Sequence, residues 1–195
     1  LCVTAYTLRQ VYRVVKDSAG SHVYSLAQNP SQFDQARLVQ ELNADNLEMF
    51  FADRVLLVEG VSDRILMRGL IDRFYQGPDD IKVIHVHGKS NIDVYIELMK
   101  IFHILYLVML DHDALAALAA QGGFHRHGAH RELMDYLERN HMFVLDNGPI
   151  ENHYPRRYQI KDSKPLNALY AAAHITPDEY HGPQMRELRE IIENL

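Results

Sequence analysis

The stretch from Arg54 to Asp63, RVLLVEGVSD, constrains the fold of this chain most strongly. Four apolar residues, 55–58, are followed at once by Glu59 and Gly60, and an amphipathic pattern begins near Asp63. An unbroken apolar run predicts a strand that is buried on both faces, as in parallel sheets. Because functional sites in open α/β sheets form beyond the carboxyl ends of strands, the acids that follow this strand are candidate site residues.

Strand and helix patterns alternate after this stretch. Apolar runs predict strands over 55–58, 82–86, 105–110 and 141–145, and helical periodicity predicts helices over 62–75, 92–103, 114–120, 131–140, 165–174 and 183–195. Ser62 is the expected N-cap of the first of these helices. Such alternation predicts an α/β fold with a mostly parallel sheet, flanked by helices and joined by right-handed crossovers.

The two ends of the chain differ from this central region. Two β-like runs around the turn-rich segment 16–21 predict a hairpin, and a helical pattern follows over 31–51. We therefore expect a β-hairpin and helix lead-in over 1–50, a catalytic core over 51–155 and a C-terminal helical segment over 156–195. The segment FHRHGAH, 124–130, is expected to be an insertion in the core.

A second apolar run, 106–110, also ends in acids, at Asp111 and Asp113. Two strands would thus deliver carboxylates to one edge of the sheet, where unit charges ~5 Å apart repel by roughly 3 kcal/mol at an effective dielectric constant of about 20. Bound divalent cations or raised pKa values relieve such repulsion. An all-oxygen set of ligands favours Mg²⁺ or Mn²⁺, whereas the simplest alternative is that acids lie at these strand ends by chance.

Composition narrows the class of protein. The 195 residues are 47% apolar, with one cysteine and no apolar run of membrane-spanning length, which is typical of a globular, cytoplasmic protein without a disulfide framework. The net charge of −6 argues against a large basic nucleic-acid-binding surface. Any contact with DNA would therefore depend on metal ions, local basic residues or a partner domain.

The order of these motifs resembles a known family. A strand ending in Glu-Gly, a βαβ unit and a later strand ending in Asp-x-Asp look like the Toprim domain of topoisomerases, bacterial primases, recombination proteins and OLD-family (overcoming lysogenization defect) nucleases. FFADRVLLVEGVSD (50–63), with its extra acid at Asp63, is most similar to the OLD family. The resemblance extends through VHGKSNIDVYIELMK (86–100) and LDNGPIENHYP (145–155) to KDSKPLNAL (161–169), and so covers about 50–171.

The resemblance implies a Rossmann-like Toprim fold and a metal-dependent DNA endonuclease that uses two Mg²⁺ or Mn²⁺ ions, with Ca²⁺ as a non-catalytic substitute. The implied metal ligands are Glu59, Asp63, Asp111, Asp113 and Glu151. The implied catalytic residues are Glu59, Asp111, Asp113 and Lys164.

Several of these assignments have rivals within the sequence. Lys161 competes with Lys164 for the catalytic role, and Asp146 competes with Glu151. Lys164, Arg156 and Arg157 are expected to contact DNA, although a solvated arginine pair is equally compatible with the sequence.

OLD-like proteins carry an N-terminal ABC-type ATPase, which is the implied partner domain along with DNA, and oligomers would form through it. The chain begins without Met and lacks a GxxxxGK[ST] phosphate loop, so we expect it to be the catalytic fragment of such a protein. The segment HGKSN (87–91) is interpreted as a strand-to-helix turn. No membrane association is expected.

Three other functions remain open. The chain could be another Toprim enzyme, such as a primase or an RNA-processing nuclease, or a non-catalytic metal- and DNA-binding module of a recombination or repair factor. A phosphoacceptor domain would use Asp111 or Asp113 but leaves Glu59 unexplained. His125, His127 and His130 have short spacings, yet no cysteine lies near them to complete a typical zinc site.

Overall fold

The computed structural model describes residues 8–28, 46–121 and 129–195. Strands are β1 (Tyr12–Asp17), β2 (Gly20–Ser25), β3 (Arg54–Val58), β4 (Ile81–His85), β5 (Leu105–Leu110) and β6 (Met142–Val144). Helices are α2 (Val61–Phe74), α3 (Ile92–Ile101), α4 (Ala114–Gln121), α5 (Ala129–Arg139), α6 (Lys164–His174), α7 (Pro177–Tyr180) and α8 (Arg186–Glu193). None of the helices in these ranges is long and apolar enough to cross a membrane.

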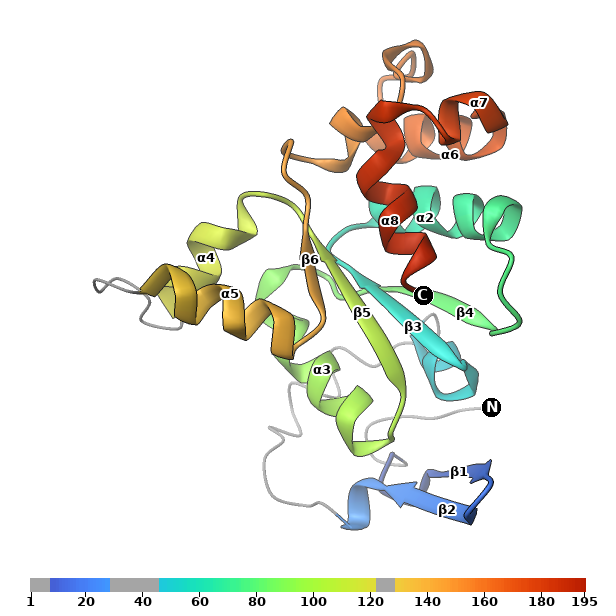
Figure 1. Ribbon diagram of the computed structural model, residues 1–195, viewed down its shortest axis with the longest axis vertical. Coiled ribbons are helices and arrows are strands. Elements are labelled where there is room, and N and C mark those ends of the chain that lie inside the picture. The colour runs from blue at the N-terminus through green and yellow to red at the C-terminus, as the bar shows by residue number, and fades with distance from the viewer. Residues whose placement is uncertain (1–7, 29–45, 122–128) are drawn as a thin grey trace.

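A four-stranded parallel sheet forms the centre of the molecule, with the order β4-β3-β5-β6 (Figure 1). Val58 at the end of β3 pairs with His85 of β4 on one side and Met109 of β5 on the other. The carboxyl ends of these three strands therefore lie at one edge. The predicted α/β fold with a parallel sheet flanked by helices is confirmed.

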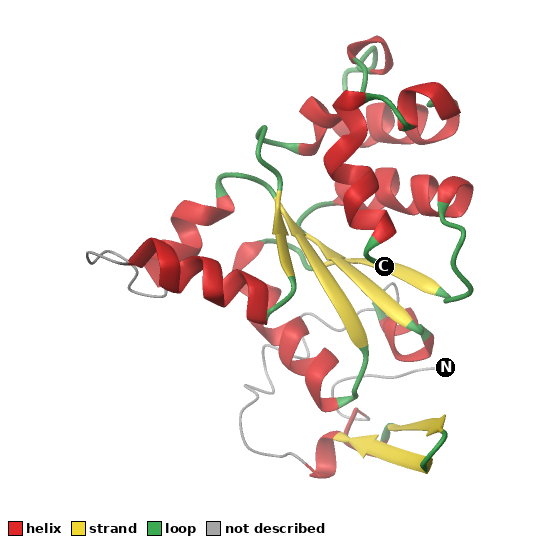
Figure 2. Cartoon of the chain, in the orientation of Figure 1, coloured by secondary structure: helices red, strands yellow, loops and turns green. Residues whose placement is uncertain are grey.

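Helices cover both faces of this sheet (Figures 1 and 2). Alternate residues of β3 point to opposite faces: Val55 and Leu57 belong to one apolar core with α3 and α4, and Leu56 and Val58 belong to a second core with α2, α6 and α8. Burial on both faces explains why this strand is uniformly apolar rather than alternating.

The N-terminal segment forms a separate two-stranded antiparallel sheet, β1-β2, which confirms the predicted hairpin. Arg13 ties it to the core, because its guanidinium donates hydrogen bonds to the backbone oxygens of Phe102 and Ala52, each at 3.2 Å. Most of the helix expected over 31–51 lies outside the described residues. Its final part, Leu47–Phe51, is a 3-10 helix.

Two local predictions were wrong. The N-cap of α2 is Gly60 rather than Ser62, because the Asp63 carboxylate accepts the Gly60 backbone N–H at 2.9 Å and moves the start of the helix two residues earlier. The expected break over 175–182 contains a short helix, α7, whose first turn is closed by a capping box between Thr176 and Glu179.

Helix α6, the first α-helix of the C-terminal segment, packs closely on α2. A Cβ atom added at Gly69 of α2 would lie 2.6 Å from the Cβ of Ala172 in α6, so only glycine permits this approach. Residues of α2 and α6 belong to the same apolar core as Leu56 and Val58 of β3, so α6 lies on the face of the sheet that α2 covers. The predicted domain limits at 50 and 155 stay a prediction.

Candidate metal centre

Two neighbouring parallel strands deliver three carboxylates to one place. Glu59 directly follows β3, Asp111 directly follows β5, and Asp113 comes immediately before α4. The turn between Asp111 and α4 is closed by a 2.9 Å hydrogen bond from the Ala114 backbone N–H to the Asp111 carbonyl oxygen. One carboxylate oxygen from each of Glu59, Asp111 and Asp113 lies within 4.8 Å of the others, so together they can hold a metal ion.

Asp63 lies next to this group in the first turn of α2. Only 7% of its surface is exposed. Burial, together with the charges of Asp111, Glu151 and Glu59, raises the pKa of Asp63 to about 7, and the hydrogen bond from Gly60 opposes this shift. The proximity of these acids makes ionised Asp63 unfavourable unless a cation is present.

Glu151 and Lys164 approach from the C-terminal part of the chain. Glu151 lies in the 3-10 helix Ile150–His153 and adds to the raised pKa of Asp111, which is due first to burial. The Lys164 Nζ, at the start of α6, lies 3.2 Å from a Glu151 carboxylate oxygen and opposes the shift of the Asp111 pKa. The structure therefore brings all five predicted acids and Lys164 around one edge of the sheet.

The two competing residues, Lys161 and Asp146, make other contacts. The Lys161 Nζ is 5.6 Å from the centroid of the Tyr170 ring. Asp146 is exposed, and its backbone N–H donates to Glu187 of α8 at 2.8 Å. The geometry favours Glu151 and Lys164, although their roles stay predictions.

Lys89 is a site residue that the sequence analysis missed. Its Nζ lies 2.6 Å from Asp113 Oδ2 and 3.8 Å from Glu59 Oε1. It follows β4, which neighbours β3, so the strand-end rule that selected Glu59 also places Lys89 at this edge. Applying that rule to the segment 87–91, instead of treating it as a turn alone, would have found this residue.

The chemistry of this group fits a divalent cation. Glu59 Oε2 is buried and has no hydrogen-bond partner among the residues that the structure describes, which leaves an acceptor that a cation could satisfy. Burial also raises the pKa of Glu59, and the nearby charges of Asp111 and Asp113 add to this effect. Oxygen-only ligands with this much negative charge match Mg²⁺ or Mn²⁺ better than zinc.

The two predicted DNA-contacting arginines have different surroundings. Arg156 lines a polar cavity of about 600 Å³ together with Glu151 and amide side chains. Arg157 donates to Glu179 at 2.7 Å and to the Tyr158 hydroxyl at 2.8 Å, so its guanidinium is engaged within the protein. Arg156 is therefore the better placed of the two to contact a substrate.

The histidines of the 124–130 segment lie mostly outside the part of the chain that the structure describes. His125 and His127 lie outside the described residues, as does most of the expected insertion, and the side chain of His130 is not described. His112, between the two aspartates, is exposed.

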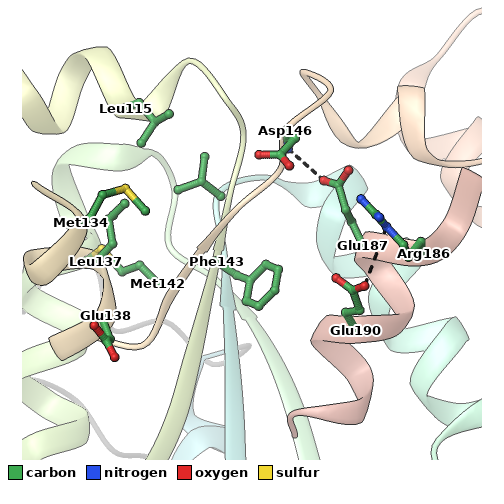
Figure 3. A pocket seen from close by; sticks show the side chains of 11 residues that line it. Leu115, Met134, Leu137, Glu138, Met142, Phe143, Asp146, Arg186, Glu187 and Glu190 are labelled. Carbon is green, nitrogen blue, oxygen red and sulfur yellow. Dashed lines mark hydrogen bonds and ion pairs between the residues drawn. The ribbon is translucent and has the colours of Figure 1, made fainter. Parts of the chain in front are cut away.

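A separate cavity of about 690 Å³ lies beside the edge strand β6 (Figure 3). Apolar side chains such as Met134, Leu137 and Phe143 line one part of it, and charged residues from α8 line another. Arg186 and Glu190 form an ion pair at 3.7 Å on this wall. None of the five predicted metal ligands lines this cavity, so it is distinct from the group of acids at the ends of β3 and β5.

Comparison with known proteins agrees with this arrangement. The sequence model of the family described as overcoming lysogenization defect protein-like, TOPRIM domain, matches residues 50–113, which span β3 to the Asp111–Asp113 pair. No curated protein matched the chain.

Solved structures with the same fold include C-terminal regions of two OLD proteins. The one from Xanthomonas campestris pv. campestris has 18% sequence identity and a TM-score of 0.51, and the match covers 75% of this chain and 95% of that one. The one from Burkholderia pseudomallei has 18% identity and a TM-score of 0.51, and the match covers 74% of this chain and 98% of that one. The family match over residues 50–113 and the shared fold together confirm the predicted resemblance to the Toprim domain of OLD-family proteins.

Proposed function

We propose that this chain is the catalytic region of a divalent-metal-dependent DNA endonuclease of the OLD type. The observation that carries the proposal is the group formed by Glu59, Asp111 and Asp113, in which a buried carboxylate oxygen of Glu59 has no hydrogen-bond partner within the described part of the chain. A merely structural acidic surface would not bury such an oxygen, because an unsatisfied buried acceptor costs about 1–3 kcal/mol.

The five acids suggest two cation positions. Glu59, Asp111 and Asp113 would hold one cation, and Asp63 and Glu151 would hold a second together with the shared Asp111. A pair of bound divalent cations supplies positive charge to the attacking and leaving oxygens of phosphodiester hydrolysis and lowers the pKa of bound water.

Two basic side chains would complete the site. Lys164 is 69% exposed beside Glu151, so its ammonium can reach a phosphate and stabilise the negative charge that develops there. Arg156 would contact the DNA backbone beyond Glu151. Such local contacts are required because the net charge of the chain is −6.

The test is cleavage of supercoiled and linear DNA by the purified protein with Mn²⁺, Mg²⁺ or Ca²⁺, compared with Asp113→Ala. We expect cleavage with Mn²⁺ or Mg²⁺, binding without cleavage with Ca²⁺, and loss of cleavage in the variant. Asp178→Ala is the matched control, because Asp178 is an exposed aspartate in the first turn of α7 and lies outside the acid group. Equal cleavage by wild type and Asp113→Ala would contradict the proposal.

Two alternatives would give different results. Faster cleavage of RNA than of DNA under the same conditions would indicate an RNA-processing Toprim enzyme. Metal-dependent DNA binding without cleavage under any metal would indicate a non-catalytic module. A full-length protein with an N-terminal ATPase, if it contains this chain, should be tested in parallel with and without ATP.

A further inference from the structure

The ammonium group of Lys89 sits directly against the acid group. It contacts carboxylates from two different elements, Asp113 before α4 and Glu59 after β3, at 2.6 and 3.8 Å. The side chains of Lys89 and Glu59 are each 23% exposed, so the contact between them is partly shielded from water, whereas the Asp113 side chain is 75% exposed. A partly buried ion pair is screened less by salt than one on the open surface.

The backbone around Lys89 holds it in this position. His87 and Gly88 have positive φ angles of 56° and 110°, which reverse the chain directly after β4. The Asn91 side chain donates to the Val86 carbonyl at 3.1 Å, and the Asn91 backbone N–H donates to the Gly88 carbonyl at 3.1 Å. Lys89 is thus presented from a loop that is tied to the end of β4.

A divalent cation and this ammonium cannot use the same oxygen in the same way. Mg²⁺ binds carboxylate oxygens at about 2.0–2.1 Å, and the Nζ of Lys89 already lies 2.6 Å from Asp113 Oδ2. Two positive groups this close repel each other strongly, since the dielectric constant near a protein surface is well below that of water. A metal bound through Asp113 Oδ2 must therefore displace the lysine.

We propose that Lys89 is a built-in counter-cation that neutralises Glu59 and Asp113 until a divalent metal displaces it, and that the released ammonium then contacts the DNA phosphate. This inference rests on the proposed metal-dependent function. It makes metal loading a switch for DNA binding: the positive charge that Lys89 presents to DNA becomes available only after the metal has bound. Lys89 thus supplies positive charge, first to the carboxylates and then to the DNA, and takes no part in the bond-breaking step.

The first test measures Mn²⁺ binding calorimetrically in the absence of DNA for wild type and Lys89→Met. Removing the competing ammonium should tighten Mn²⁺ binding by about tenfold, which corresponds to about 1.4 kcal/mol. Lys82→Met is the matched control, because Lys82 forms a 2.8 Å ion pair with Asp80 at the opposite end of β4 from Lys89. Removing the Lys82 ammonium should leave Mn²⁺ affinity unchanged. Unchanged or weaker Mn²⁺ binding by Lys89→Met, or no Mn²⁺ binding by wild type, would overturn the proposal.

The second test measures DNA affinity with Ca²⁺ and with EDTA. Lys89→Met should lose affinity several-fold with Ca²⁺ but not with EDTA, because only the metal-bound protein releases the ammonium. An equal loss under both conditions would show that Lys89 reaches DNA without displacement and would refute the switch.

Neither measurement depends on cleavage, so the two proposals can fail separately. If wild type cleaves no nucleic acid but Lys89→Met binds Mn²⁺ more tightly, the nuclease proposal fails and the counter-cation proposal stands. If wild type cleaves DNA and Lys89→Met shows no change in Mn²⁺ affinity, the counter-cation proposal fails and the nuclease proposal stands. Chemical denaturation of each variant verifies that it is folded.

Discussion

Replacing Asp63 with Asn should stabilise the metal-free protein at alkaline pH and much less at acidic pH. Burial raises the pKa of this carboxyl from 3.8 to about 7, so the folded protein holds the proton more tightly than the unfolded chain does. The stabilisation due to the protonated form is complete below pH ~4 and is lost as the pH rises through about 7. Asn mimics the protonated carboxyl and retains an oxygen that can accept the Gly60 N–H.

The size of this effect follows from the shift. Each pKa unit corresponds to 1.36 kcal/mol, so a shift of about three units lowers the stability of wild type, relative to a side chain that stays neutral, by about 4 kcal/mol at pH 8 and by about 1.5 kcal/mol at pH 5. Asp63→Asn should thus gain about 2.5 kcal/mol more at pH 8 than at pH 5. In a protein of this size such a difference corresponds to roughly 5–10 °C in Tm.

The assay is urea denaturation in EDTA at pH 5 and pH 8 for wild type, Asp63→Asn and Asp178→Asn. Asp178 is the control because it occupies the first turn of a helix but is exposed. Adding Mn²⁺ at pH 8 should stabilise wild type more than Asp63→Asn, since the metal favours the ionised carboxylate. A gain from Asp63→Asn that is equal at both pH values, or absent at pH 8, would refute the reasoning.

Three further predictions concern packing, catalysis and DNA contact. Gly69→Ala should lower the free energy of unfolding by about 1–3 kcal/mol through overpacking, and adding Ala172→Gly should restore it in denaturant titrations. Lys164→Met should lower the single-turnover rate of DNA cleavage with Mn²⁺ by about 10²-fold, whereas Lys161→Met should have little effect, and equal losses would contradict the assignment. Arg156→Gln should weaken DNA binding in Ca²⁺ and reduce the salt dependence by about one ion, and an unchanged salt slope would exclude a phosphate contact.

Sequence periodicity predicted most of the sheet, because its strands are buried on both faces and therefore appear as unbroken apolar runs. The order of strand, acid and helix also identified Glu59, Asp111 and Asp113, since the carboxyl ends of neighbouring parallel strands meet at one edge whatever the details of packing. The sequence failed at local hydrogen bonding: Gly60 caps α2 because the Asp63 side chain folds back on it, and the apolar pattern carries no information on that bond.

Only the tertiary structure decided which residues from distant segments join the acids. Glu151 and Lys164 come from different elements, yet they pair at 3.2 Å and both lie close enough to Asp111 to affect its pKa, and no local pattern separates them from nearby residues of the same type. The position of Lys89 depends on β4 being the neighbour of β3, which is a property of strand order in space. The sequence by itself determined the strand ends and their acids, because both are local features. The partners that neutralise these acids were decided by packing between elements far apart in the chain.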